Sequence, residues 1–214
     1  MVTRLKNIAR FGARDLNKSS LSDGEKVSIA LESMTDTAEQ AELLSSLFKR
    51  IEPFGGRKRG RPKQISVNEV IDRAISILQQ EADDRSVQLV GDGSDITVKL
   101  DEAELLTVLV NLIQNAIYWT ATQPQGIERK VVTGARTNED GSLTLVVSDS
   151  GPGVPSESCD HIFDPYFSSK PDGVGLGLSI VGNLVEDIYA GELTLVDEGA
   201  LDGATFEATF RRRV

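Results

Sequence analysis

The sequence predicts an α+β fold, a two-layer sandwich of helices on a sheet, preceded by an α-helical hairpin. Two observations support this prediction. Residues 3–52 contain no proline and carry apolar residues at helical spacing, without the alternation typical of strands. From residue 65 onward, short apolar runs typical of strands are mixed with longer segments of helical period, and such elements pack as helices on a sheet.

The first expected domain, residues 1–52, reads as a helical dimerisation hairpin. Leu5, Ile8 and Phe11 indicate a short helix, and an apolar stripe over residues 27–51 indicates a longer one. Ser22-Asp23-Gly24 between them is a turn or helix-start signal. The stripe is too apolar to remain exposed, so we expect a homodimer formed through these helices.

Residues 53–64 are expected to be a basic linker. Its stretch Lys58-Arg59-Gly60-Arg61-Pro62-Lys63 resembles the AT-hook, whose Arg-Gly-Arg-Pro core lies in the narrow, negative minor groove of A·T-rich DNA. A solvated linker is the simpler interpretation of so short a match in an acidic protein, and the cations could also pair with the acidic domain that follows. We therefore do not expect DNA to be a partner.

The second expected domain, residues 65–214, contains the sheet. Its predicted elements are a strand at 65–67, a helix at 68–82, strands at 87–90 and 96–98, a helix around 105–116, strands at 130–137 and 142–148, a loop, a helix at 178–189, and strands at 192–196 and 205–210.

Composition restricts the classes of function. The chain has 214 residues and a formal net charge of -10, which argues against general affinity for nucleic acid or acidic membranes. Its single cysteine, Cys159, fits a reducing compartment. No apolar run approaches the length of a membrane span, so we expect a cytoplasmic protein or the cytosolic part of a larger sensor.

Four short blocks in the second domain carry the functional signal. They are Asn111-Leu-Ile-Gln-Asn115-Ala, Asp149-Ser-Gly151-Pro-Gly153, Phe163-Asp-Pro165-Tyr-Phe167-Ser-Ser-Lys170 and Gly173-Val-Gly175-Leu-Gly177-Leu178. Each block alone also has an ordinary structural interpretation, such as surface amides or a turn that ends a strand. The four blocks in this order within one domain indicate a binding site.

The polar residues of these blocks suit a magnesium-chelated adenine nucleotide. Asn111 and Asn115 are four residues apart and share one face of a helix. Magnesium prefers oxygen ligands and keeps several waters, so an amide oxygen from Asn115 or Asn111 plus phosphate oxygens could form its shell. Asp149 can accept a hydrogen bond from an exocyclic amine, which distinguishes adenine from guanine.

The glycines of these blocks suit close approach to the same ligand. Gly151 and Gly153 permit positive φ near a flat ring. Gly173, Gly175 and Gly177 leave backbone N–H groups available, and the helix at 178–189 would direct its positive end at phosphate. The expected cofactors are ATP and Mg²⁺.

With these blocks, residues 65–210 resemble the C-terminal ATP-binding domain of sensor histidine kinases, in the superfamily that includes gyrase, a heat-shock chaperone and a mismatch-repair ATPase. The blocks are similar to the family's N box, first glycine box, F box and second glycine box, and Gly203-Ala-Thr205-Phe206 is similar to its closing strand. The resemblance implies the Bergerat ATP-binding fold, with Asn115 as the magnesium ligand, Asp149 as the adenine contact and residues 153–173 as a mobile lid. The ATP-binding residues that it implies are Asn111, Asn115, Tyr118, Asp149, Gly151, Gly153, Phe167, Lys170, Gly173, Gly175, Leu176, Gly177, Leu178 and Thr205.

Asn111 distinguishes two branches of that superfamily. In the hydrolysing members a glutamate at this place activates water as a general base. The Asn111 amide cannot take a proton at neutral pH, so the site should hold ATP without hydrolysing it quickly. This favours the kinase branch.

The phosphoacceptor histidine of the family has no counterpart in residues 1–64, which contain no histidine. Arg14 stands at the nearest matching position, as a relic or by chance, and arginine is always protonated and cannot accept a phosphoryl group. The one histidine, His161, falls in the lid. The acceptor therefore lies upstream, in another protein, or nowhere, and no catalytic residue is assigned in this chain.

We expect an enzyme of the protein-histidine kinase type. It would transfer the γ-phosphoryl group of ATP to a histidine and then to the receiver domain of a response regulator. The alternative is an ATP-gated interaction module of the same superfamily without phosphotransfer, in which lid closure changes the hairpin. The missing histidine favours the alternative, whereas Asn111 and the complete F box favour the kinase.

Overall fold

A computed structural model describes residues 22, 62–92, 95–124, 126–171 and 173–211. The chain divides into two compact units, Met1–Arg57 and Lys58–Val214, and every helix and strand described below belongs to the second unit. The expected helical hairpin at residues 1–52 and most of the linker at residues 53–64 lie outside the described residues.

Within the described residues, seven strands form two sheets. The main sheet has the spatial order β2 (Gln88–Asp92), β4 (Lys130–Thr137), β5 (Leu143–Asp149), β7 (Thr205–Phe210), β6 (Glu192–Val196). β2 pairs with β4 in parallel, and the other pairs of this sheet are antiparallel. β1 (Lys63–Ser66) and β3 (Thr97–Leu100) form a separate antiparallel pair.

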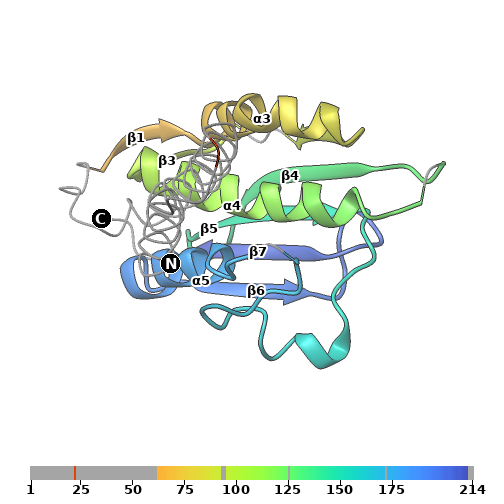
Figure 1. The fold of residues 1–214 in the computed structure, drawn as a ribbon. Coiled ribbons are helices and arrows are strands. Elements are labelled where there is room, and N and C mark those ends of the chain that lie inside the picture. The colour runs from red at the N-terminus through yellow and green to blue at the C-terminus, as the bar shows by residue number, and fades with distance from the viewer. Residues whose placement is uncertain (1–21, 23–61, 93–94, 125, 172, 212–214) are drawn as a thin grey trace. The chain divides into compact units, whose positions relative to one another are not determined.

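The long helices begin at polar caps. The Ser66 side chain accepts a hydrogen bond from the Glu69 N–H at the start of α3 (Val67–Asp84), and Asp101 accepts from the Ala103 and Glu104 N–H groups at the start of α4 (Glu102–Thr120). In Figure 1, α4 crosses in front of the main sheet, with α3 to one side of it and α5 (Gly177–Gly182) to the other. The helices thus form one layer and the sheet the other.

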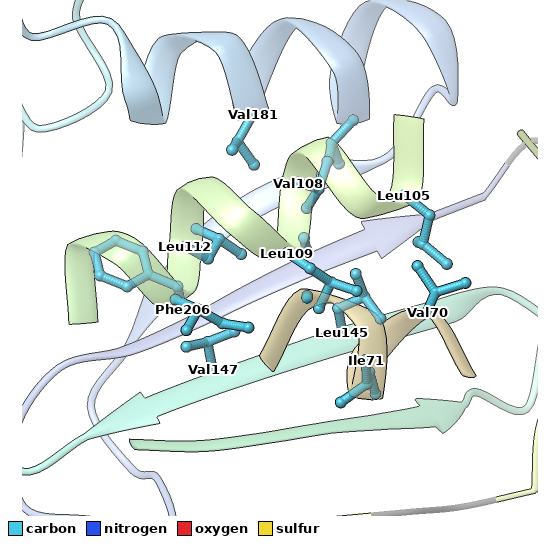
Figure 2. Packing of buried hydrophobic residues seen from close by; sticks show 14 of the residues in the cluster. Val70, Ile71, Leu105, Val108, Leu109, Leu112, Leu145, Val147, Val181 and Phe206 are labelled. Atoms are coloured by element: carbon cyan, nitrogen blue, oxygen red, sulfur yellow. The ribbon is translucent and has the colours of Figure 1, made fainter. Parts of the chain in front are cut away.

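The core lies between these two layers. Figure 2 shows Leu112 of α4 above Val147 of β5, and Leu109 of α4 above Leu145 of β5 and Ile71 of α3. Leu109 and Leu112 are fully buried. Burial of each such side chain contributes roughly 1.5–3 kcal/mol, so packing fixes α4 firmly on the sheet.

The predicted fold class is confirmed for the described part of the chain, and the strands at 130–137, 192–196 and 205–210 have the predicted bounds. Three features were not predicted, the first being a short 3-10 helix, η1 (Ser156–Ser158), in the expected loop. β1 begins at Lys63, two residues early, and pairs with β3 outside the main sheet. The helix predicted at 178–189 begins at Gly177 and continues as a π-helix, η2 (Asn183–Ile188). Within the described residues, none of the helices has the length and apolar character needed to cross a bilayer.

Candidate functional site

Asp149 is buried because of its place in β5. Alternate side chains of a strand share one face, and Leu143, Leu145 and Val147 of β5 belong to the core between sheet and helices. Asp149 is the next residue in this row, so its carboxylate points to the helix side at the end of the strand. Only 2% of the residue is exposed.

The backbone holds one oxygen of the Asp149 carboxylate. The N–H groups of Gly151 and Ala204 donate to Oδ1 at 2.8 Å and 3.2 Å. Among the described residues no hydrogen bond ends on Oδ2. Burial raises the pKa of this carboxyl, and the hydrogen bonds from Gly151 and Ala204 oppose the rise. The group is therefore an oriented acceptor with one oxygen not used by the described part of the protein.

Glycines allow the backbone to approach Asp149 closely. A Cβ at Gly203 would lie 2.4 Å from both the backbone oxygen and Oδ1 of Asp149. A Cβ at Gly151 would lie 2.8 Å from Oδ1 and 3.2 Å from the backbone nitrogen of Thr120. The end of β5 therefore meets the C-terminal end of α4. There the hydroxyl of Thr120 is buried and has no hydrogen-bond partner among the described residues.

Asn111 and Asn115 lie one turn apart on α4, and their amides make different contacts. The Asn111 side chain donates through Nδ2 to the backbone oxygen of Thr107 at 2.8 Å. A Cβ at Gly177 would lie 3.3 Å from Asn111 Oδ1 and 3.8 Å from Asn115 Nδ2. Gly177, the first residue of α5, therefore faces both amides, and its lack of a side chain leaves room for them.

A lysine of the expected lid reaches α4. Lys170 donates from Nζ to Asn115 Oδ1 at 2.7 Å. The same ammonium lies 4.4 Å from the ring centroid of Tyr118, and the guanidinium of Arg85 lies 5.7 Å from that centroid. An amide oxygen and an aromatic face are both attractive to cations.

The F box and the second glycine box pack together through their backbones. The Tyr166 N–H donates to the Gly175 oxygen at 2.8 Å, and both residues have positive φ, 68° and 71°. A Cβ at Gly175 would lie 2.4 Å from the carbonyl oxygen of Phe167. Phe163 contacts Phe206 of β7 edge-to-face with ring centroids 6.3 Å apart. The middle of the lid is thus fixed to the sheet.

The structure brings most of the expected site residues into two neighbouring groups. One group surrounds the Asp149 carboxylate at the end of β5, with Gly151 beside it. The other group joins α4, the F box and the start of α5. Gly203, Ala204 and Thr120 belong to the first group and were not predicted as site residues, although Gly203 and Ala204 fall in the closing-strand motif. Their contacts with Asp149 and Gly151 arise only when β5 meets β7 and α4.

Thr205 does not join either group through its side chain. It pairs with Ser148 across β5 and β7, and the two hydroxyl oxygens are 2.8 Å apart. Ser148 alternates with Val147 and Asp149, so both hydroxyls lie on the sheet face opposite the helices. Thr205 as an ATP-binding residue stays a prediction, and in this structure the N–H of the neighbouring Ala204 contacts Asp149.

Two lid residues with reactive side chains stay outside both groups. His161 bonds Asp164 through Nδ1 at 3.0 Å, and both side chains are exposed. Cys159 is a free thiol whose sulfur donates to the Pro155 backbone oxygen at 3.5 Å. Neither contacts the residues around Asn115 or Asp149 through a hydrogen bond among the described residues.

The described residues alone would not complete the ligand shell of a metal ion here. The described residues contain no group of three or more histidine, cysteine or acidic side chains that could hold one. Asn115 Oδ1 already accepts a hydrogen bond from a cationic ammonium, so its place suits a positive ion. One amide oxygen fits a magnesium ion whose remaining ligands are phosphate oxygens and waters.

Comparison with known proteins matches residues 100–214 to the family described as histidine kinase-, DNA gyrase B-, and HSP90-like ATPase. The sensor histidine kinase ZraS of Klebsiella oxytoca is 29% identical over 86% of this chain. The chain spans 38% of the length of that relative.

Solved structures of histidine kinases have the same fold. The nucleotide-free catalytic domain of histidine kinase ThkA is 27% identical, with a TM-score of 0.60 over 71% of this chain and 95% of that domain. A structure of ThkA in complex with the response regulator protein TrrA is 22% identical, with a TM-score of 0.64 over 98% of this chain and 59% of that one. The latter likeness concerns the fold alone.

Proposed function

Because the chain belongs to the family of histidine kinase-, DNA gyrase B- and HSP90-like ATPases, we propose that it binds ATP with Mg²⁺ and presents the γ-phosphoryl group to a histidine. In this proposal residues 65–214 are the ATP-binding domain, residues 1–52 the dimerisation hairpin and residues 53–64 the linker. The phosphoryl group then passes to an aspartate of a response regulator in the cytoplasm.

The observation that carries the nucleotide assignment is the buried carboxylate of Asp149. Two backbone N–H groups orient it through Oδ1. Its other oxygen can accept a hydrogen bond from the exocyclic amine of adenine, which guanine lacks at that position. Gly151 and Gly203 permit the close approach of the backbone around it.

At the other group, Asn115 is the residue that would hold magnesium. The bound ion would neutralise charge on the phosphate chain of ATP. The other contacts with the phosphate chain would come from residues of this chain. Asn115 places an oxygen toward the lid, Lys170 supplies a cation, and the glycines before α5 leave backbone N–H groups for phosphate oxygens. The second-box residues Gly173, Leu176 and Leu178 are proposed contacts at that end.

Transfer to a histidine is favoured over hydrolysis by the contacts of Asn111. Its amide has no basic atom, and its Nδ2 already donates to Thr107. A water molecule beside it would not lose a proton to this side chain. In the proposed reaction the bond from the γ-phosphorus to the β-phosphate oxygen breaks, and a bond to an imidazole nitrogen forms. ADP leaves, and the imidazole loses its proton.

The second candidate function is an ATP-gated interaction module without phosphotransfer. It is favoured by the absence of a histidine from residues 1–64. Calorimetry with ADP and ATP, each with Mg²⁺ and with a chelator, tests nucleotide binding in both cases. Incubation with γ-labelled ATP and candidate receiver domains or histidine phosphotransfer proteins then separates them. Acid-labile label on a partner supports the kinase, and tight binding without label supports the module.

A further inference from the structure

The ammonium of Lys170 has an unusual location for a cation expected to meet phosphate. It lies 2.7 Å from Asn115 Oδ1, and Asn115 is the residue proposed to hold magnesium. Lys170 belongs to the lid segment, residues 153–173, whereas Asn115 belongs to α4. The contact therefore connects the lid with α4 through a single acceptor atom, Asn115 Oδ1.

Two side chains of α4 contact this ammonium. Asn115 and Tyr118 are three residues apart, so their side chains share one face of the helix. Asn115 contributes the amide oxygen, and Tyr118 contributes its ring face at 4.4 Å from Nζ. Both groups are neutral, and such contacts contribute roughly 0.5–2 kcal/mol each when partly buried.

We propose that Lys170 is an internal substitute for the metal ion, which holds the lid on α4 until Mg²⁺ and nucleotide replace it at Asn115. This inference rests on the proposed function, because it uses Asn115 as the metal ligand. An ammonium 2.7 Å from Oδ1 and a metal ion ligated by the same oxygen would lie within about 5 Å of each other, and two cations repel at so short a separation. Lys170 must leave when the metal enters, and the lid moves with it.

The same displacement gives Lys170 a positioning role. Once released from Asn115, its ammonium is available to the phosphate oxygens that arrive with the metal. A ligand without phosphate and metal has no reason to displace Lys170. Adenosine should therefore occupy the Asp149 end and leave the contact with Asn115 intact, whereas Mg·ADP should break it.

Carbon-13 labelling of the lysines in the full chain tests this inference by NMR spectroscopy. The ring current of Tyr118 should shift the Cε protons of Lys170 upfield of those of Lys99, an exposed lysine on β3 that serves as the internal control. The signal is assigned by its loss in Lys170→Met. Tyr118→Leu should abolish the upfield shift, whereas Tyr118→Phe, which keeps the ring, should retain it.

Ligand titrations complete the experiment. We expect adenosine to leave the Lys170 signal in place and Mg·ADP to move it toward the position of Lys99. An unshifted signal in the nucleotide-free chain would overturn the inference. So would a shifted signal that stays in place when calorimetry shows the chain saturated with Mg·ADP. If calorimetry shows no binding of adenosine or Mg·ADP, the proposed function fails instead, and the inference fails with it.

Discussion

Two opposing effects meet at the carboxyl group of Asp149. Burial raises its pKa above the ordinary value of 3.8, so the fold disfavours the ionised form. A hydrogen bond from an amine to a carboxylate is stronger when the carboxylate is ionised. Asp149 therefore costs stability in the empty protein and gains interaction energy when an adenine is bound. Both effects can be measured on one substitution.

We predict that Asp149→Asn weakens binding of ATP and of adenosine by roughly 1–3 kcal/mol, the cost of leaving a buried donor without its acceptor. Asparagine keeps an oxygen for the Gly151 and Ala204 N–H groups, so the local backbone should be preserved. Isothermal calorimetry measures the change. Unchanged affinity for both ligands would remove Asp149 from the site.

The same variant should be more stable than the parent protein at pH 7. Between pH 3.8 and the raised pKa, the folded protein binds more protons at Asp149 than the unfolded chain does. Stability therefore falls as pH rises through that window, and the penalty remains above it. Asparagine removes the penalty. Denaturant titrations should show a stability gain for Asp149→Asn at pH 7 that shrinks toward pH 4. A gain that does not depend on pH would show that this titration is not its source.

The two amides of α4 should differ in their response to removal. Asn115→Ala should abolish the part of ADP affinity that depends on Mg²⁺ and leave the affinity measured with a chelator. Asn111→Ala should have a smaller effect on the metal, because its Nδ2 bonds Thr107 and its oxygen faces Gly177 rather than the lid. Calorimetry across a magnesium series provides the measurement. Normal Mg·ADP binding in both variants would refute the assignment of this helix face.

At the scale of elements, two glycines provide a matched pair of substitutions. One is Gly182, in the helix that follows the second glycine box, and the other is Gly203, which precedes β7. Gly182 lies at the join of α5 and η2 in helical conformation, and a Cβ there would contact nothing within 4 Å. Gly182→Ala should raise stability by about 0.5–1 kcal/mol, because glycine loses more backbone entropy on folding. Gly203→Ala should lower stability by roughly 1–3 kcal/mol, since its Cβ would overlap Asp149. Thermal melts of both variants check the signs, and the same sign for both would contradict the packing described here.

Most elements of the second unit could be predicted from the sequence because their signals are local. The apolar row of β5 and the capped apolar face of α4 are readable from neighbouring residues, and so are the glycines that end each element. The pairing of β1 with β3 could not be predicted, because it depends on which strand edges remain available after the main sheet has formed. The π-helical second half of the last helix also has no local signal in its sequence, Asn183–Ile188.

The candidate site likewise has features that could be predicted from the sequence and features that could not. The residue types at positions 111, 115 and 149 predict a site because the four blocks occur in order within one domain, and the structure brings these residues into the two groups described above. The partners of these residues could not be predicted. Lys170 reaches Asn115 only through the loop conformation of the lid, and Ala204 reaches Asp149 only through strand pairing.

For the whole molecule, we predict that this chain alone does not autophosphorylate but still forms a homodimer. Phosphotransfer needs a neutral imidazole, and the one histidine, His161, is an exposed lid residue bonded to Asp164. The dimer is expected from the apolar stripe in residues 27–51. Light scattering measures the mass in solution, and γ-labelled ATP reports phosphorylation. Acid-labile label on this chain that survives His161→Gln would contradict the prediction, and label lost in that variant would identify His161 as an acceptor.

The adjacency of β5 and β7 has a consequence for how the chain reaches its folded state. Asp149 ends β5 and Thr205 begins β7. The pairing of β5 with β7 can therefore form only after the intervening segment, which includes the lid, α5 and β6, has folded back toward β5. Pairings between distant segments slow folding. The entropy of closing such a loop grows only with the logarithm of its length, about 0.6 kcal/mol for each doubling. The lid, which lies between β5 and α5 along the chain, can therefore gain or lose residues with little effect on the final stability, while the folding rate changes with each insertion.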